Sequence, residues 1–138
     1  MILETKKIPY DTLCPDKNLT DFLSFLRNVK MRYEGNVREK EEKEAQLQDL
    51  EHYIELHPDM DCKGGYREYK RMRDARRQRR SLKCENELLF PLYEWISLNE
   101  QALDDLAVTL GRVRKTAETI ESRKYMTRTS VLEEEDNG

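Results

Sequence analysis

The chain has little of what a thick globular core requires. Hydrophobic residues make up 37% of its 138 residues, whereas ordinary globular domains contain about 45–50%. Glycine, proline and tryptophan are also few, with 5, 4 and 1 residues. No run of 18 apolar residues occurs, so we expect no transmembrane helix and no membrane partner. These shortages argue against a compact α/β enzyme core.

Cysteine is scarce as well. The chain has three cysteines, an odd number, which lie far apart and form no Cys-x-x-Cys pair: Cys14, Cys62 and Cys84. The N-terminus also lacks the long apolar core of a secretory signal peptide. We therefore expect reduced thiols and a cytoplasmic location.

Motifs that carry catalysis or bind metals are missing. The chain has no phosphate-binding loop, no nucleophile elbow and no His-Glu-x-x-His helix. His52, His57 and Cys62 lack the paired spacing of a zinc site, and a calcium loop starting at Asp59 would have lysines at ligand positions. We expect no enzyme activity, no cofactor and no metal.

The residues that are abundant predict an all-α fold. Ala, Leu, Glu, Lys and Arg together number 65, close to the half that is typical of long helices and coiled coils. Apolar residues recur at steps of three and four, which predicts a first helix over about 19–57 that ends before Pro58. The residues of this face are Leu19, Phe22, Leu23, Leu26, Val29, Tyr33, Val37, Leu47, Leu50 and Ile54.

Two further helices follow a loop at 58–65. The second is predicted over about 66–96, with a kink or break at Pro91. The third is predicted over 98–125, since Ser97 and Glu100 have the spacing of a capping box. Its apolar residues keep a strict three–four spacing that indicates a coiled-coil seam: Leu103, Leu106, Leu110, Val113, Ala117 and Ile120.

These elements predict one helical domain over 19–126. The first two helices form a long antiparallel hairpin, like a coiled coil, and the third completes a three-helix bundle or makes a dimeric rod. Residues 1–18 contain Pro9 and Pro15 and are expected to form an extended arm. The acidic tail at 127–138 is expected to be disordered.

The net charge of −3 conceals blocks of opposite sign. Residues 38–56 carry −4, 66–83 carry +7 and 84–111 carry −6. Folding the chain back at 58–65 places the first two blocks opposite each other and brings Tyr33 near Phe90. We therefore predict an ion pair between one of Glu41, Glu42 or Glu44 and one of Arg76, Arg79 or Arg80. The third block has no partner in the first two helices.

Two surfaces are candidates for binding. The acidic stretch contains an aromatic group and is apolar around much of its circumference from Leu88 to Ile96, which leaves a face for a partner or a third helix. The residues predicted to bind a partner protein are Glu87, Tyr93, Glu94, Trp95, Glu100, Asp104 and Asp105. The alternative is a nucleic-acid site on the basic helix, because arginine suits phosphate groups: Lys70, Arg73, Arg76, Arg77, Arg80 and Lys83.

The hypothesis that follows is a non-catalytic helical protein whose partner is another protein or its own copy. Small size and segregated charge fit an inhibitor or regulator from a phage or mobile element that binds a host protein. The alternative function is a nucleic-acid-binding accessory protein that uses 67–83. Core packing of the aromatic group, and neutralisation of the basic helix by the acidic block of the first helix, remain open alternatives.

Overall fold

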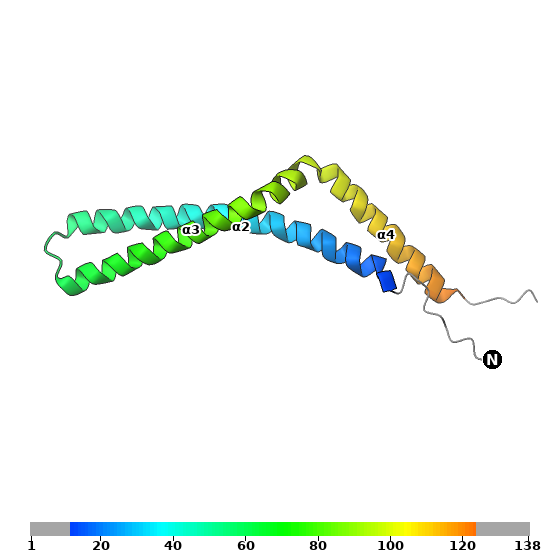
Figure 1. The fold of residues 1–138 in the computed structure, drawn as a ribbon, viewed down its shortest axis with the longest axis horizontal. Helices are drawn as coiled ribbons and strands as arrows, with labels where there is room; N and C mark the ends of the chain where they lie inside the picture. Colours follow the sequence, from blue (N-terminus) through cyan, green and yellow to red (C-terminus); the bar gives the residue numbers. More distant parts are fainter. Residues whose placement is uncertain (1–11, 124–138) are drawn as a thin grey trace, which may run out of the picture. The chain divides into compact units, whose positions relative to one another are not determined.

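The computed structural model describes residues 12–123 and is all-α over them (Figure 1). Three long helices follow one another along the chain: α2 covers Pro15–Leu56, α3 covers Cys62–Leu98 and α4 covers Glu100–Ser122. None of them is long and apolar enough to cross a membrane. The predicted acidic tail and most of the predicted arm lie outside the described residues.

Local capping explains why the helix ends differ from the predicted ones. Pro15 is the first residue of α2, four residues before the predicted start, because the first helical position needs no N–H donor. Asp61 caps α3 by accepting a hydrogen bond from the Gly64 nitrogen at 2.7 Å, so the glycine pair predicted as loop lies inside the helix. A Cβ atom at Gly64 would lie 2.6 Å from Cγ of Met60.

The end of α3 also differs in detail from the prediction. Pro91 does not break the helix, which continues to Leu98. It lies on the exposed side, where the carbonyl group left without an N–H donor can face water. Ser97 does not cap the next helix; α4 begins at Glu100, directly after Asn99, whose side chain donates to the Trp95 carbonyl at 2.8 Å. The second and third helices are thus separate elements.

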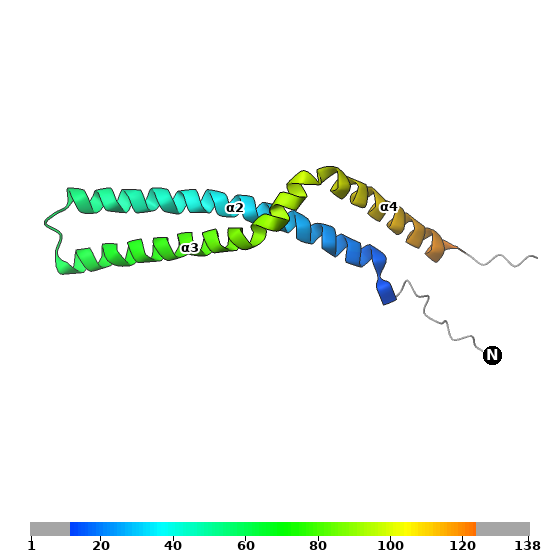
Figure 2. The same ribbon diagram turned by 45° about the horizontal axis from the view of Figure 1, so that its top comes forward.

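The described part of the chain divides into two compact units, residues 21–103 and residues 12–20 with 104–123. In the first unit, α2 and α3 lie side by side and run in opposite directions (Figures 1 and 2). The Tyr33 and Phe90 rings lie 6.3 Å apart, as predicted. Arg79 Nε lies 3.0 Å from Glu44 Oε1, which confirms the predicted ion pair.

Burial along α2 and α3 follows a heptad pattern. Apart from Lys30 and Gly35, the buried and half-buried positions of α2 in the first unit from Leu26 onward recur at steps of three and four: Leu26, Val29, Tyr33, Asn36, Lys40, Lys43, Leu47 and Leu50. Those of α3 do the same apart from Gly64, Arg73 and Glu85: Glu68, Met72, Ala75, Arg79, Leu82, Asn86, Leu89, Tyr93 and Ile96. Such spacing keeps one face of each helix turned toward the other. The seam carries several polar residues in its middle, and its ends are mainly apolar except for the buried Glu68 near the loop.

The compact core lies at one end of this seam. Leu26, Val29 and Ile96 are each 3–4% exposed and pack together, with Leu89 and Leu103 against them. At the other end Leu50 and Ala75 are buried. Only six hydrophobic residues are buried over residues 12–123, so the helices keep most of their apolar surface in contact with water.

The second unit combines the start of α2 with most of α4. Arg114 Nη2 donates to Thr20 Oγ1 at 2.8 Å. Cys14, Pro15 and Asp16 share a pocket with Val113, Ala117 and other residues of α4. The predicted seam residues of α4 within this unit are half-buried or buried, so part of the seam is used inside the chain.

Candidate functional site

The three–four seam divides the surface of α3 into two flanks. Each flank begins beside the contact with α2 and extends toward the exposed side of the helix. The flank that starts at Tyr69 carries the basic residues, and we call it the basic flank. The opposite flank carries Glu85, Leu88, Leu92 and Trp95, and we call its last three residues the apolar stripe.

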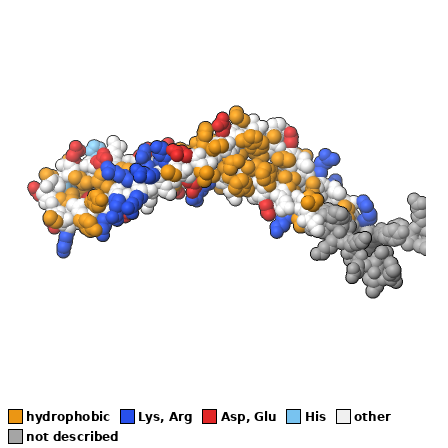
Figure 3. Space-filling model, viewed as in Figure 1, with side chains coloured by type: hydrophobic (Ala, Val, Ile, Leu, Met, Phe, Trp, Pro, Cys, Tyr) orange, Lys and Arg blue, Asp and Glu red, His pale blue; other side chains and the backbone are white. Residues whose placement is uncertain are grey.

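The basic flank brings together all six residues predicted for nucleic-acid binding. They follow one another at helical spacing and include no acidic side chain: Lys70, Arg73, Arg76, Arg77, Arg80 and Lys83. All are exposed except Arg73, which is half-buried. In Figure 3 blue side chains gather over the same part of the paired helices. Sequence reasoning therefore placed these six residues together correctly.

Two arginines of α3 outside this flank take carboxylate partners. Arg79 pairs with Glu44, and Arg71 Nη1 lies 3.3 Å from Glu68 Oε1. Within residues 12–123, no carboxylate lies within ion-pair distance of Arg76, Arg77, Arg80 or Lys83, and Arg73 contacts only its neighbour Asp74 at 3.5 Å. Glu44 pairs with Arg79 and lines a pocket with Glu41 and Lys83, so the acidic block of α2 approaches the basic flank but forms no ion pair with Arg76, Arg77 or Arg80 within residues 12–123.

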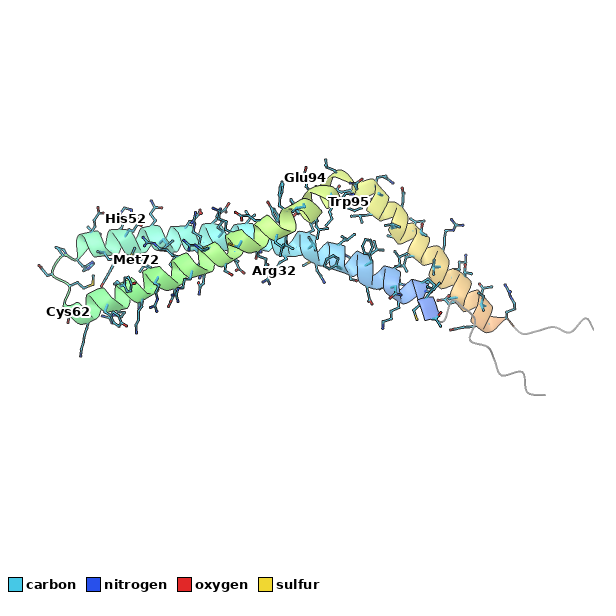
Figure 4. All side chains as sticks on the ribbon, viewed as in Figure 1. Arg32, His52, Cys62, Met72, Glu94 and Trp95 are labelled. Atoms are coloured by element: carbon cyan, nitrogen blue, oxygen red, sulfur yellow. The ribbon has the colours of Figure 1, made fainter. Side chains whose placement is uncertain are left out.

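The predicted protein-binding residues do not form one surface. Tyr93 is half-buried in the seam, where its ring stacks on Tyr33 at a centroid distance of 4.0 Å and its hydroxyl contacts Glu34. Trp95 is 43% exposed and belongs to the other side of α3. Figure 4 labels Glu94 and Trp95 near the C-terminal end of the helix. Successive helical residues differ by about 100° in direction, which separates Tyr93, Glu94 and Trp95.

The acidic members of the set also separate. Glu87 and Glu94 are exposed and seven residues apart on one face of α3. Glu100 lies 3.6 Å from Nζ of Lys30 on α2. Asp104 and Asp105 are exposed and belong to the other compact unit. The third charge block was predicted to have no partner in the first helices; this is wrong for Glu100 and for Glu85.

Glu85 belongs to a polar network in the middle of the seam. Its carboxylate accepts hydrogen bonds from Arg32 and from Asn36 Nδ2. Asn36 also donates to Asn86 Oδ1 at 2.9 Å, and Asn86 donates to the Tyr33 carbonyl at 3.2 Å. The Arg32 and Asn36 hydrogen bonds lower the pKa of Glu85 below 4.5. This network links the two helices at one defined register.

Leu88 and Leu92 of the apolar stripe were not among the residues predicted to bind a partner, although the apolar circumference from Leu88 to Ile96 indicated a face in this segment. Leu88 is 77% exposed and Leu92 is 38% exposed, and with Trp95 they repeat the four–three spacing of a helix seam. Arg32 and Glu85 contact each other on this side. Phe25 lies seven residues before Arg32 on α2, and Leu92 lies seven residues after Glu85 on α3. Phe25 is 50% exposed. The spacing 88–92–95 is the signal that identifies this face.

Other kinds of site lack support in the described part of the chain. No group of three or more His, Cys, Asp and Glu side chains in residues 12–123 is placed to hold a metal ion. In comparisons with known proteins, no family model, curated protein or solved structure matches this chain.

Proposed function

We propose that this chain is a non-catalytic helical interaction protein that binds another protein or a second copy of itself. In this proposal α2 and α3 form an antiparallel coiled-coil hairpin that serves as a scaffold. The observation that carries it is the apolar stripe: an exposed second row of apolar residues on a helix that already uses its first row against α2.

A second seam on one helix has a physical meaning. A two-helix pair buries one apolar row on each helix and leaves the other faces polar. Here Leu88, Leu92 and Trp95 stay exposed beside Phe25, whereas Leu89, Tyr93 and Ile96 face α2. Hydrophobic side chains gather over this part of the molecule in Figure 3. A contiguous exposed apolar surface of this kind marks an interaction site.

The stripe suits a partner helix. Leu88 and Trp95 are separated by seven residues, or two helical turns of about 10 Å, which is enough for one heptad of side chains to pack between them. Tryptophan at the centre of an interface contributes more binding energy than most residues. The narrower hypothesis of a phage or mobile-element inhibitor of a host protein rests on size and charge alone and stays a prediction.

The test compares the stripe with an exposed apolar position outside it. The variant carries Leu92→Gln and Trp95→Gln, and the control carries Met31→Gln, since Met31 is 62% exposed elsewhere on α2. Sedimentation over a hundredfold range of concentration detects a second copy, and affinity capture from cell extract detects another protein. We expect the double variant to lose the complex and the control to keep it.

Two results would contradict the proposal. One is a protein that stays monomeric at all concentrations and captures nothing that depends on Leu92 and Trp95. The other is equal loss of the complex in the Met31→Gln control. Circular dichroism must show the same helix content in all variants, because glutamine keeps a high helix propensity at exposed positions.

A further inference from the structure

The basic flank of α3 has a shape as well as a charge. Six of its side chains line one shallow groove of about 320 Å³: Tyr69, Met72, Arg73, Arg76, Arg77 and Arg80. All six come from α3, so the groove exists because side chains at helical spacing stand apart along one face. Four of the six are arginines.

We propose that this groove binds the phosphate backbone of double-stranded nucleic acid. Arg76, Arg77 and Arg80 are exposed and, over residues 12–123, have no carboxylate partner, so their guanidinium groups remain available for phosphate oxygens. A guanidinium donates two parallel hydrogen bonds to one phosphate, which is why arginine suits this ligand better than lysine. The site lies on the opposite flank from the apolar stripe and does not depend on it.

The spacing of charge matches a duplex. Arg73 to Arg80 span seven residues, or about 10 Å of helix, and a duplex carries about six phosphates over that length of its own axis. Lys70 and Lys83 extend the same flank at both ends. Acidic side chains also lie close to this flank, since Glu44 pairs with Arg79 and lines a pocket with Glu41 and Lys83. Charges at such distances are not fully screened at physiological salt, so they are expected to weaken phosphate binding at the Lys83 end of the flank.

The surrounding side chains favour a duplex over a single strand. Proteins that bind single strands present aromatic rings on which successive bases stack. Tyr69 is the one aromatic residue that lines the groove, and the ring of nearby Tyr66 is covered by Nζ of Lys70 at 4.5 Å from its centroid. The groove thus offers cations for the backbone and little for bases, so we expect binding without sequence preference.

The experiment measures fluorescence anisotropy of a labelled 24-base-pair DNA duplex with the full chain. With four phosphate contacts, the affinity falls roughly 100-fold between 50 and 200 mM salt, and the slope of log affinity against log salt is about −3.6. The triple variant Arg76→Gln, Arg77→Gln and Arg80→Gln leaves one contact, so its slope falls to about −0.9. An RNA duplex of the same sequence is expected to bind in the same way.

A matched control removes the same charge elsewhere. Arg27, Arg38 and Arg112 are exposed, and changing all three to Gln gives the same net charge as the groove variant. Full binding by this control supports the groove, whereas equal loss in both triple variants overturns it. No binding at 50 mM salt, tighter binding to a single strand of equal length, or tighter binding to polyglutamate also overturns the assignment. None of these outcomes affects the test of the apolar stripe.

Discussion

Asn36 is the most deeply buried polar side chain of the seam, with 3% of its surface exposed. Its amide group donates to Glu85 and to Asn86, and Asn86 in turn donates to the Tyr33 carbonyl. A buried amide in the seam favours the one register of the two helices in which its hydrogen-bond partners lie opposite it. Burying the amide costs some stability. At the scale of the residue, this network determines how α2 and α3 align.

Removing Asn36 alone should lower the stability of the fold. Removing both Asn36 and Asn86 should allow α2 and α3 to pair in more than one register. Asn36→Ala leaves the Asn86 oxygen without its donor and is expected to lower the free energy of unfolding by about 1–3 kcal/mol. The double variant Asn36→Leu with Asn86→Leu is expected to be at least as stable as the wild type. Urea denaturation measures both, and cross-linking between engineered cysteines on α2 and α3 reports whether more than one register forms. A double variant with one register would show that apolar contacts alone align the helices.

Glu85 should make stability depend on pH. Its pKa in the folded chain lies below 4.5, chiefly because Arg32 donates a hydrogen bond to the ionised carboxylate, and Asn36 adds a second. The ionised form therefore stabilises the fold above pH 4.5, and this contribution is lost as pH falls through the lower folded value. Urea denaturation from pH 7 downward should show Glu85→Gln less stable than the wild type at pH 7, with the difference shrinking as the pH falls below 4.5. Glu87→Gln, which removes a carboxylate at an exposed position of the same helix, is the control.

At the scale of the element, α3 is a long helix that tolerates an internal proline. Pro91 stands two residues before Tyr93 and two after Leu89, so the seam residues point to the other side. A proline inside a helix removes one backbone hydrogen bond and clashes with the preceding turn, at a cost of about 3 kcal/mol. The apolar stripe surrounds this position, which places the weakest turn of α3 within the surface proposed to bind a partner.

Replacing this proline should stabilise the helix. Pro91→Ala restores a donor for the carbonyl of Glu87 and is expected to raise the free energy of unfolding by about 1–3 kcal/mol. Thermal denaturation followed by circular dichroism measures the change. Pro58→Ala, in the loop before α3, is the control and should have a small effect. A loss of stability in Pro91→Ala would mean that the helix backbone needs the shape that proline imposes.

At the scale of the whole molecule, stability depends on few residues. The packed cluster of Leu26, Val29 and Ile96 is small, and small domains have a total stability of about 5–15 kcal/mol. Much of the remaining apolar surface is exposed. Each core residue therefore accounts for a large share of what keeps residues 21–103 folded.

A single truncation in this cluster should lower the stability of the fold substantially. Ile96→Ala removes a side chain that is 3% exposed and is expected to cost about 2–5 kcal/mol. Leu98→Ala changes a leucine that is 76% exposed and should cost less than about 0.5 kcal/mol. Thermal denaturation distinguishes the two variants. Equal melting temperatures would show that the cluster is not the core.

The sequence was sufficient to predict the three helices and part of the pairing between the first two. Apolar periodicity and opposite charge predicted the three helices, the contact of Tyr33 with Phe90 and the ion pair of Glu44 with Arg79. The full seam was not predicted from apolar periodicity, because polar or charged residues occupy three of its positions: Asn36, Lys40 and Arg79. Tyr93 and Trp95 were grouped because they are close in sequence, although a helix turns them to different sides. Asp61 could have signalled the earlier start of α3, since it is a favourable capping residue.

The polar middle of the seam also affects how the paired helices open. Lys40, Lys43 and Arg79 hold like charges between the cluster around Ile96 and the buried Leu50 and Ala75 at the loop end. Separating the two helices at the loop end breaks only the contacts at that end, because the charged residues in the middle contribute little packing energy that would couple the two ends. Backbone amides at the two ends should therefore exchange hydrogen with separate opening free energies. The α2–α3 pair then behaves as two cooperative segments within one continuous pair of helices.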